Sequence, residues 1–114
     1  MKEVNYDELN RIRELSGTLQ ESWQEKMQGR PMPFDAEILD DHPATVSNPF
    51  SGESILLDPQ EIAVYDVIMG SNLTAERLAA QGKHKEAEAL YKDVRKGSDW
   101  FRKHNPEAYM VLID

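Results

Sequence analysis

The residues best suited to chemistry stand next to one another at Asp40, Asp41 and His42. Carboxylate oxygens and an imidazole nitrogen can together hold a divalent cation. Adjacent residues seldom point the same way, however, and the sequence has no second group at metal-ligand spacing. We therefore interpret these residues as a polar turn before Pro43, and we predict neither a bound metal nor a cofactor.

No catalytic arrangement is recognisable in the sequence. His84 and His104 flank a basic segment, and the sequence places no partner carboxylate beside either, which a general base needs. The serines lack a nucleophile-elbow pattern, the glycines are isolated instead of forming a phosphate loop, and cysteine is absent. We predict that the protein is not an enzyme.

Aromatic and basic side chains are the remaining candidates, and they suit binding better than catalysis. An exposed tryptophan or another large aromatic ring can anchor an interface with a partner protein. The predicted partner contacts are the aromatic residues Trp23, Phe34, Phe50 and Trp100 and the basic residues Lys92, Lys96 and Lys103. Such a mixture could also attract nucleic acid. The net charge of −8 opposes this, so direct nucleic-acid binding is not expected.

Charge is distributed unevenly along the 114 residues. Residues 1–63 hold 5 Lys or Arg and 13 Asp or Glu, whereas residues 83–104 hold 7 and 4. Two solvated faces are the simplest interpretation. A second interpretation is contact between an acidic half and a basic helix. A third is that the acidic half imitates nucleic acid and inhibits a DNA- or RNA-binding host protein.

Two long helices must position most of these residues. Asp58-Pro59-Gln60-Glu61 combines an N-cap, a proline at the first helical position and the glutamate of a capping box. We predict a helix over residues 59–81, a left-handed stop at Gly82 and a second helix over residues 83–104 that Pro106 ends. The apolar residues of the first of these helices fall in two stripes, which predicts neighbours on two sides. These residues are Ile62, Val64, Tyr65, Ile68, Met69, Leu73, Ala75 and Ala79.

Shorter elements precede and follow this helical hairpin. A thin apolar edge opposite an acidic face predicts a first helix over residues 5–28. Prolines interrupt the irregular segment 29–57, where the turn at residues 48–53 predicts a small β-hairpin. A short helix over residues 106–113 closes the chain. The predicted fold is mainly α, a single helical domain of residues 1–114.

The predicted β-hairpin needs support from the helices, because two strands alone are marginally stable. We expect Phe50, Ile55 and Leu57 to pack it against them. The sequence has no signal-like apolar core and no run of the ~20 apolar residues that cross a bilayer. We therefore expect a cytoplasmic protein without membrane association.

Four motifs carry a resemblance over residues 48–114. They are Asn-Pro-Phe-Ser-Gly-Glu (48–53), Val-Tyr-Asp (64–66), Arg-Lys-Gly-Ser-Asp-Trp-Phe-Arg-Lys (95–103) and Ala-Tyr-Met-Val-Leu-Ile-Asp (108–114). This part of the chain resembles small uncharacterised proteins of tailed bacteriophages. The resemblance implies a context and no mechanism. We expect a non-enzymatic interaction or assembly protein that self-associates or binds a protein partner, as a virion component or as a host-directed binder in the host cytoplasm.

Overall fold

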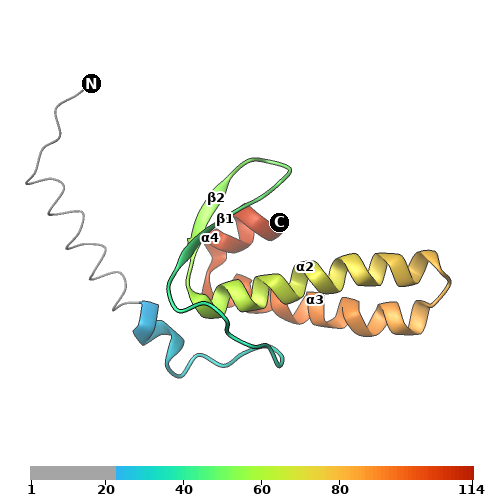
Figure 1. Cartoon of the computed structure of the whole chain (residues 1–114), viewed down its shortest axis with the longest axis horizontal. Helices are drawn as coiled ribbons and strands as arrows, with labels where there is room; N and C mark the ends of the chain where they lie inside the picture. Colours follow the sequence, from blue (N-terminus) through green and yellow to red (C-terminus); the bar gives the residue numbers. More distant parts are fainter. Residues whose placement is uncertain (1–22) are drawn as a thin grey trace, which may run out of the picture. The chain divides into compact units, whose positions relative to one another are not determined.

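A computed structural model describes residues 23–114 of the chain (Figure 1). The described residues fall into two units, with the boundary between Arg30 and Pro31. In the first unit, residues 23–27 are helical and Gly29 has a positive φ of 73°. The predicted helix end near residue 28 is therefore confirmed, while residues 5–22 of that helix lie outside the described residues.

Helix α2 spans Pro59–Ala80 and begins as its sequence predicts. The Asp58 side chain accepts a hydrogen bond from the Glu61 backbone N–H at 2.8 Å, and the Glu61 carboxylate accepts one from the Asp58 N–H at 2.9 Å. These two bonds satisfy donors that a helix start otherwise leaves unpaired. The helix then continues through Gly70 to its C-cap at Gln81.

Helix α3 spans His84–His104 and packs against α2 as an antiparallel hairpin (Figure 1). Gly82 joins the two helices with φ 79°, a left-handed conformation that glycine adopts without steric cost. Ala87, Gly97 and Phe101 are buried on one face of α3, and Leu90 and Val94 are partly buried beside them. The predicted helical hairpin and the mainly α fold are confirmed.

A two-stranded antiparallel sheet precedes the helical hairpin. Strand β1 (Ala44–Ser47) pairs with β2 (Ser54–Leu57) in a register that places Val46 opposite Ile55. Side chains alternate between the two faces of a strand. Leu57 is fully buried and Ile55 is partly buried, whereas Leu56 between them is 54% exposed. The predicted β-hairpin is therefore present, and it packs on the core through Leu57 and Ile55.

The chain ends in a helical segment that turns back over the core. Helix α4 (Pro106–Ala108) continues directly into η1 (Tyr109–Ile113), which has π-helical hydrogen bonding. The Asn105 side chain caps this segment by accepting a hydrogen bond from the Ala108 N–H at 3.1 Å, and its amide donates to Glu61 Oε2 at 2.8 Å. The short helix expected over residues 106–113 is present, with its second part wound more loosely than an α-helix.

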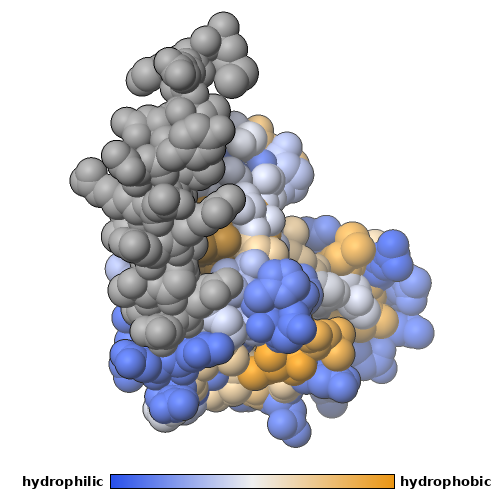
Figure 2. Space-filling view, turned by 60° about the vertical axis from the view of Figure 1, so that its left-hand side comes forward, coloured by the Kyte–Doolittle hydropathy of each residue, from blue (hydrophilic) through white to orange (hydrophobic). Residues whose placement is uncertain are grey.

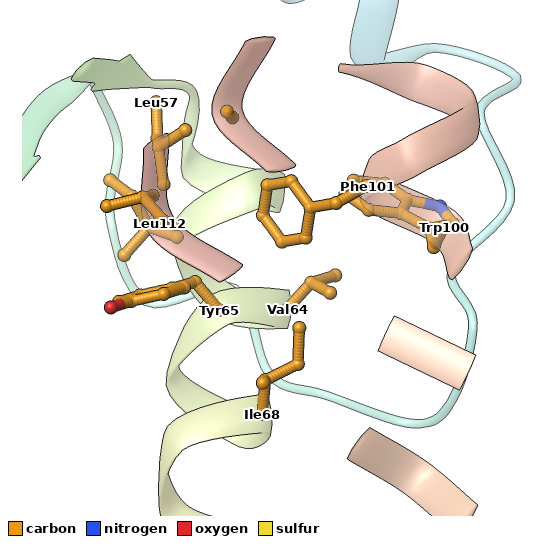
Figure 3. Close-up of a cluster of buried hydrophobic side chains, with 9 residues drawn as sticks. Leu57, Val64, Tyr65, Ile68, Trp100, Phe101 and Leu112 are labelled. Atoms are coloured by element: carbon orange, nitrogen blue, oxygen red, sulfur yellow. The ribbon is translucent and has the colours of Figure 1, made fainter. Parts of the chain in front are cut away.

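The core gathers at the end of the hairpin where α2 begins and α3 ends. Figure 3 shows the Phe101 ring in the middle of this cluster, between side chains of α2 and of the C-terminal segment. Trp100 meets Phe101 edge to face, with ring centroids 5.2 Å apart. The buried members are Leu57, Ile62, Val64, Tyr65, Ile68, Trp100, Phe101, Ala108 and Leu112.

The expectation that α2 has neighbours on two sides is wrong for its outer half. Ile62, Tyr65 and Ile68 are buried, but Met69 is 41% and Leu73 is 52% exposed. Beyond the core, α2 packs against α3, and Ala75 and Ala87 are the small side chains buried there. The hairpin therefore extends from the core as a two-helix arm, and Met69 and Leu73 lie on its surface.

We predict that Asn105→Ala lowers the free energy of unfolding by about 2–3 kcal/mol, measured by urea denaturation. It removes the cap of α4 and also a donor to the Glu61 carboxylate, which is 6% exposed. Asn105→Asp keeps the acceptor but brings a second negative charge to Glu61, so it should be no more stable than the alanine variant at neutral pH. Glu76→Gln, at an exposed position of α2, should change stability by less than about 0.5 kcal/mol. Equal stability of all three variants would contradict the role of Asn105 as the cap of α4 and the donor to Glu61.

A matched pair of glycines tests the close approach of α2 and α3. A Cβ on Gly97 would lie 2.5 Å from Ile68 Cγ1 and 3.2 Å from Phe34 Cε2, whereas a Cβ on Gly70 meets no atom within 4 Å. Gly97→Ala should therefore cost about 1–3 kcal/mol. Gly70→Ala should stabilise the protein by up to about 1 kcal/mol through helix propensity. Thermal unfolding measures both, and Ile68→Ala should reduce the cost of Gly97→Ala. A stabilising Gly97→Ala would disprove the close contact.

Candidate functional site

The turn between β1 and β2 is held by its own side chains. Asn48 Oδ1 accepts hydrogen bonds from the backbone N–H groups of Phe50 and Ser51, at 2.8 and 3.3 Å. The Asn48 N–H donates to the Glu53 carbonyl at 2.7 Å, and the Gly52 N–H donates to the Asn48 carbonyl at 2.9 Å. Asparagine commonly organises turns in this way. The backbone on both sides of Phe50 is therefore held in one conformation.

Two further contacts secure the same turn. Ser51 Oγ accepts a hydrogen bond from the Glu53 N–H at 3.1 Å. The Asn48 amide also donates to the Val111 carbonyl at 2.9 Å, across 63 residues of sequence. One asparagine therefore shapes the turn and attaches it to the C-terminal segment η1.

Phe50 projects from this ordered turn with 95% of its surface exposed. The expectation that it packs the β-hairpin against the helices is therefore wrong, because Leu57 and Ile55 do that. Burying a phenylalanine is worth about 1.5–3 kcal/mol, which the folded chain does not gain here. Single exposed apolar residues are common on proteins. Phe50 differs because a hydrogen-bonded turn presents it in a defined position.

Other apolar side chains also reach the surface. Figure 2 shows orange hydrophobic residues gathered in patches among blue hydrophilic ones. The large exposed apolar residues are Ile38, Leu39, Phe50, Leu56, Met69, Leu73 and Met110. Phe50 is the most exposed of them, followed by Leu39 at 78%.

The other aromatic residues predicted to contact partners are less available. Trp100 is 6% exposed, and its indole N–H donates to the Pro31 carbonyl at 2.6 Å. It is a core residue, so the structure does not present its ring as an exposed anchor. Phe34 is partly buried against the same core, beside Gly97. Trp23 is partly buried, and its N–H makes no hydrogen bond within the part of the chain that the structure describes.

The predicted lysines remain accessible. Lys92, Lys96 and Lys103 are exposed on α3, and none forms an ion pair among residues 23–114. Lys85 shares their face, since it precedes Lys92 by seven residues, or about two helical turns. Sequence reasoning overlooked Lys85, although its spacing was the signal that could have found it.

Of the three candidate metal-binding residues Asp40, Asp41 and His42, the structure brings two together. His42 and Asp41 are exposed and form an ion pair, despite the expectation that adjacent side chains diverge. The hydrogen bond and charge of His42 lower the pKa of the Asp41 carboxyl. Within residues 23–114, no three His, Cys, Asp or Glu side chains come together as a metal-binding group. The geometry supports a local ion pair.

Burial changes the pKa of two neighbouring side chains in the first half of α2, Tyr65 and Asp66. It raises the pKa of the Asp66 carboxyl, and the negative charge of Asp40 raises it further. Burial also raises the pKa of the Tyr65 hydroxyl, with a smaller contribution from Asp66. The negative charges of Asp66 and Asp40 therefore repel each other. Among the described residues, no hydrogen bond joins these two carboxyl groups.

We predict that Asp66→Asn stabilises the fold at neutral pH by no more than about 0.5 kcal/mol, since the carboxyl stays partly solvated. The folded-state pKa lies above the unfolded one, so the ionised carboxylate lowers stability. That loss disappears as the pH falls below the ordinary pKa of about 4. Urea unfolding at several pH values measures this gain, which should shrink when Asp40→Asn is also present. Destabilisation by Asp66→Asn at neutral pH would contradict the repulsion.

Comparison of the chain with protein-family models, with curated proteins and with solved structures finds no match. Within residues 23–114, no helix combines the length and the apolar character that crossing a bilayer requires. Among the described residues, the exposed Phe50 on its hydrogen-bonded turn is the best-defined candidate for a binding contact.

Proposed function

We propose that the protein acts by binding other protein molecules, as an interaction or assembly protein without catalytic activity. The observation that carries this proposal is the 95% exposed Phe50 on a turn held by Asn48 and Ser51. Aromatic side chains that enter a partner's pocket supply a large share of interface energy. Phe50 is presented in the manner of such an anchor.

The turn that carries Phe50 is preorganised for binding. A flexible loop loses conformational freedom when it binds, and this loss reduces affinity. In this protein the turn loses that freedom during folding. The Asn48 side chain accepts a hydrogen bond from the Phe50 N–H, and the Asn48 backbone bonds to Glu53 and Gly52, before any partner arrives. The bond from Asn48 to the Val111 carbonyl joins the turn to a packed helical segment. The turn can therefore insert Phe50 into a pocket with little loss of freedom.

The biological context that we propose is a tailed bacteriophage. The resemblance of residues 48–114 to small phage proteins supports it, and the motif Asn-Pro-Phe-Ser-Gly-Glu in that resemblance is the turn that presents Phe50. The protein would act in the virion or in the host cytoplasm, on a virion protein or on a host protein.

An acidic inhibitor that imitates nucleic acid is the second candidate. Its support is the run of residues 31–76, which contains nine Asp or Glu and no Lys or Arg. The carboxylates of the predicted first helix lie mostly outside the described residues. Competition with duplex DNA for a basic host protein, weakened by salt, tests this candidate. The Phe50 interface predicts no such competition.

We predict that Phe50→Ala strongly reduces capture of the partner while leaving the fold unchanged. The side chain is almost fully exposed, so unfolding should shift by less than about 0.5 kcal/mol. Loss of an anchor should weaken binding by about 2 kcal/mol or more, roughly thirtyfold. Quantitative mass spectrometry compares the host proteins retained by immobilised wild-type and Phe50→Ala chains. The affinity of the purified partner for both chains is then measured.

Leu73→Ala is the matched control, because Leu73 is an apolar residue that is 52% exposed on α2, a helix that does not carry the turn. It should retain the same partner as the wild type. Phe50→Trp should keep much of the affinity, since it preserves an aromatic anchor. Identical retention by wild type and Phe50→Ala would overturn the proposal.

A further inference from the structure

A line of positive charge runs along the outer face of α3. Lys85, Lys92, Lys96 and Lys103, here called the lysine stripe, are spaced by seven, four and seven residues and are all exposed. Residues at these spacings share one face of a helix. The buried residues Ala87, Gly97 and Phe101 lie on the opposite face, against α2. The lysine stripe therefore points away from the core.

The arginines of α3 are engaged differently from these lysines. Arg95 pairs with Glu88 at 2.8 Å, and Arg102 approaches Asp99 at 3.7 Å. Within the described residues, no carboxylate lies at ion-pair distance from any lysine of the stripe. Glu88 and Asp99 thus lie beside arginines of the same helix. Among the described residues, the positive charge of the stripe has no partner.

A segment of the same chain has the complementary chemistry. Residues 35–41, here called the acidic segment, carry Asp35, Glu37, Asp40 and Asp41 around the exposed residues Ile38 and Leu39. The segment forms neither helix nor strand, and all four carboxylates are exposed. Asp41 pairs with His42, and the other three have no cationic partner among the described residues.

Local sequence cannot neutralise the acidic segment. The chain has no Lys or Arg between Arg30 and Arg77, and it has nine Asp or Glu over that range. The negative charge of Asp40 also raises the pKa of the Asp66 carboxyl, after the larger effect of burial. Eight of the 13 basic residues follow later in sequence, and four of the five lysines among them form the lysine stripe. Such separation of charge favours association between two molecules.

The charge spacings of the two surfaces also agree. Along α3, the lysines from Lys85 to Lys103 are about 10.5, 6 and 10.5 Å apart, at 1.5 Å per residue. An extended chain advances about 3.3 Å per residue. If the acidic segment lies extended on α3, Asp35 and Glu37 share one face of it and are about 7 Å apart. Two carboxylates can therefore meet Lys92 and Lys96, which are about 6 Å apart along the helix.

We propose that the lysine stripe of one molecule binds the acidic segment of a second copy of this chain, head to tail. In a pair joined by one such contact, one molecule keeps a free stripe and the other keeps a free segment, so the contact can repeat into a ring or a filament. The proposal extends the interaction function above by naming one partner. It does not depend on Phe50, which lies outside both surfaces.

Nucleic acid is the competing anion, and the overall charge disfavours it. The chain carries a net charge of −8, and the nine carboxylates of residues 31–76 would repel a phosphate backbone. A second copy brings those carboxylates as the ligand itself. The occupant that we favour is therefore the acidic segment.

Reciprocal charge reversal tests this contact in the full-length protein. Lys92→Glu with Lys96→Glu reverses the stripe, and Asp35→Lys with Glu37→Lys reverses the acidic segment. Sedimentation velocity should show salt-sensitive self-association of the wild type. Raising the salt from about 20 mM to about 500 mM shortens the Debye length from roughly 20 Å to roughly 4 Å. Each reversed variant should associate at least roughly tenfold more weakly, and an equimolar mixture of the two should regain association.

Charge-matched controls separate the contact from general electrostatics. Arg77→Glu with Lys83→Glu, and Glu76→Lys with Glu107→Lys, change the net charge equally at exposed positions outside both surfaces. These controls and Phe50→Ala should associate as the wild type does. Circular dichroism checks that every variant folds.

Three outcomes would overturn the proposal. The first is a wild type that stays monomeric at low salt and at the highest concentration that remains in solution. The second is a mixture of reversed variants that fails to associate. The third is binding of an oligonucleotide to the lysine stripe without self-association, which would assign the stripe to nucleic acid. The capture experiment with Phe50→Ala tests only the Phe50 interface, so its result leaves the contact between the stripe and the segment untouched.

Discussion

The structure of residues 31–114 depends on a small buried polar junction. Asp58 and Glu61 cap the start of α2 through each other's backbone, and Asn105 donates to Glu61 from the end of α3. Asn105 also caps α4. One carboxylate and one amide thereby connect the beginning of one long helix, the end of the other and the C-terminal segment. Asp58 and Glu61 are buried and Asn105 is partly buried, and buried polar groups are costly unless they are paired. These hydrogen bonds therefore favour the observed arrangement of the three elements.

The position of this junction determines where apolar burial is concentrated. The β-hairpin, α4 and η1 all gather at the same end of the helical hairpin, around Phe101 (Figure 3). Beyond that end, α2 and α3 have only each other, and their approach relies on the small residues Gly97, Ala75 and Ala87. An arm of two helices cannot bury its outer faces. The apolar outer face of α2 and the basic outer face of α3 both follow from this arrangement.

The two proposed interaction surfaces differ in their physics. Phe50 is a single apolar anchor on a turn that Asn48 holds, and its binding energy would come from removing one aromatic ring from water. The lysine stripe acts through charge and geometry over about five helical turns. Charge complementarity contributes more to orientation and association rate than to affinity. Together the two surfaces would combine a selective anchor with a directional, salt-dependent contact.

The sequence by itself determined what depends on near neighbours along the chain. Asp58, Pro59 and Glu61 start α2 through contacts within four residues, and Gly82 ends it because few other residues adopt its backbone angles. The sequence therefore predicted the helical hairpin and the β-hairpin correctly. Only the tertiary structure decided that Trp100 is buried, and that Met69, Leu73 and Phe50 are exposed. Periodicity shows that a residue is apolar on one face of an element. Whether that face is covered depends on contacts between distant segments, such as those from Trp100 to Pro31 and from Asn48 to Val111, which no local pattern encodes.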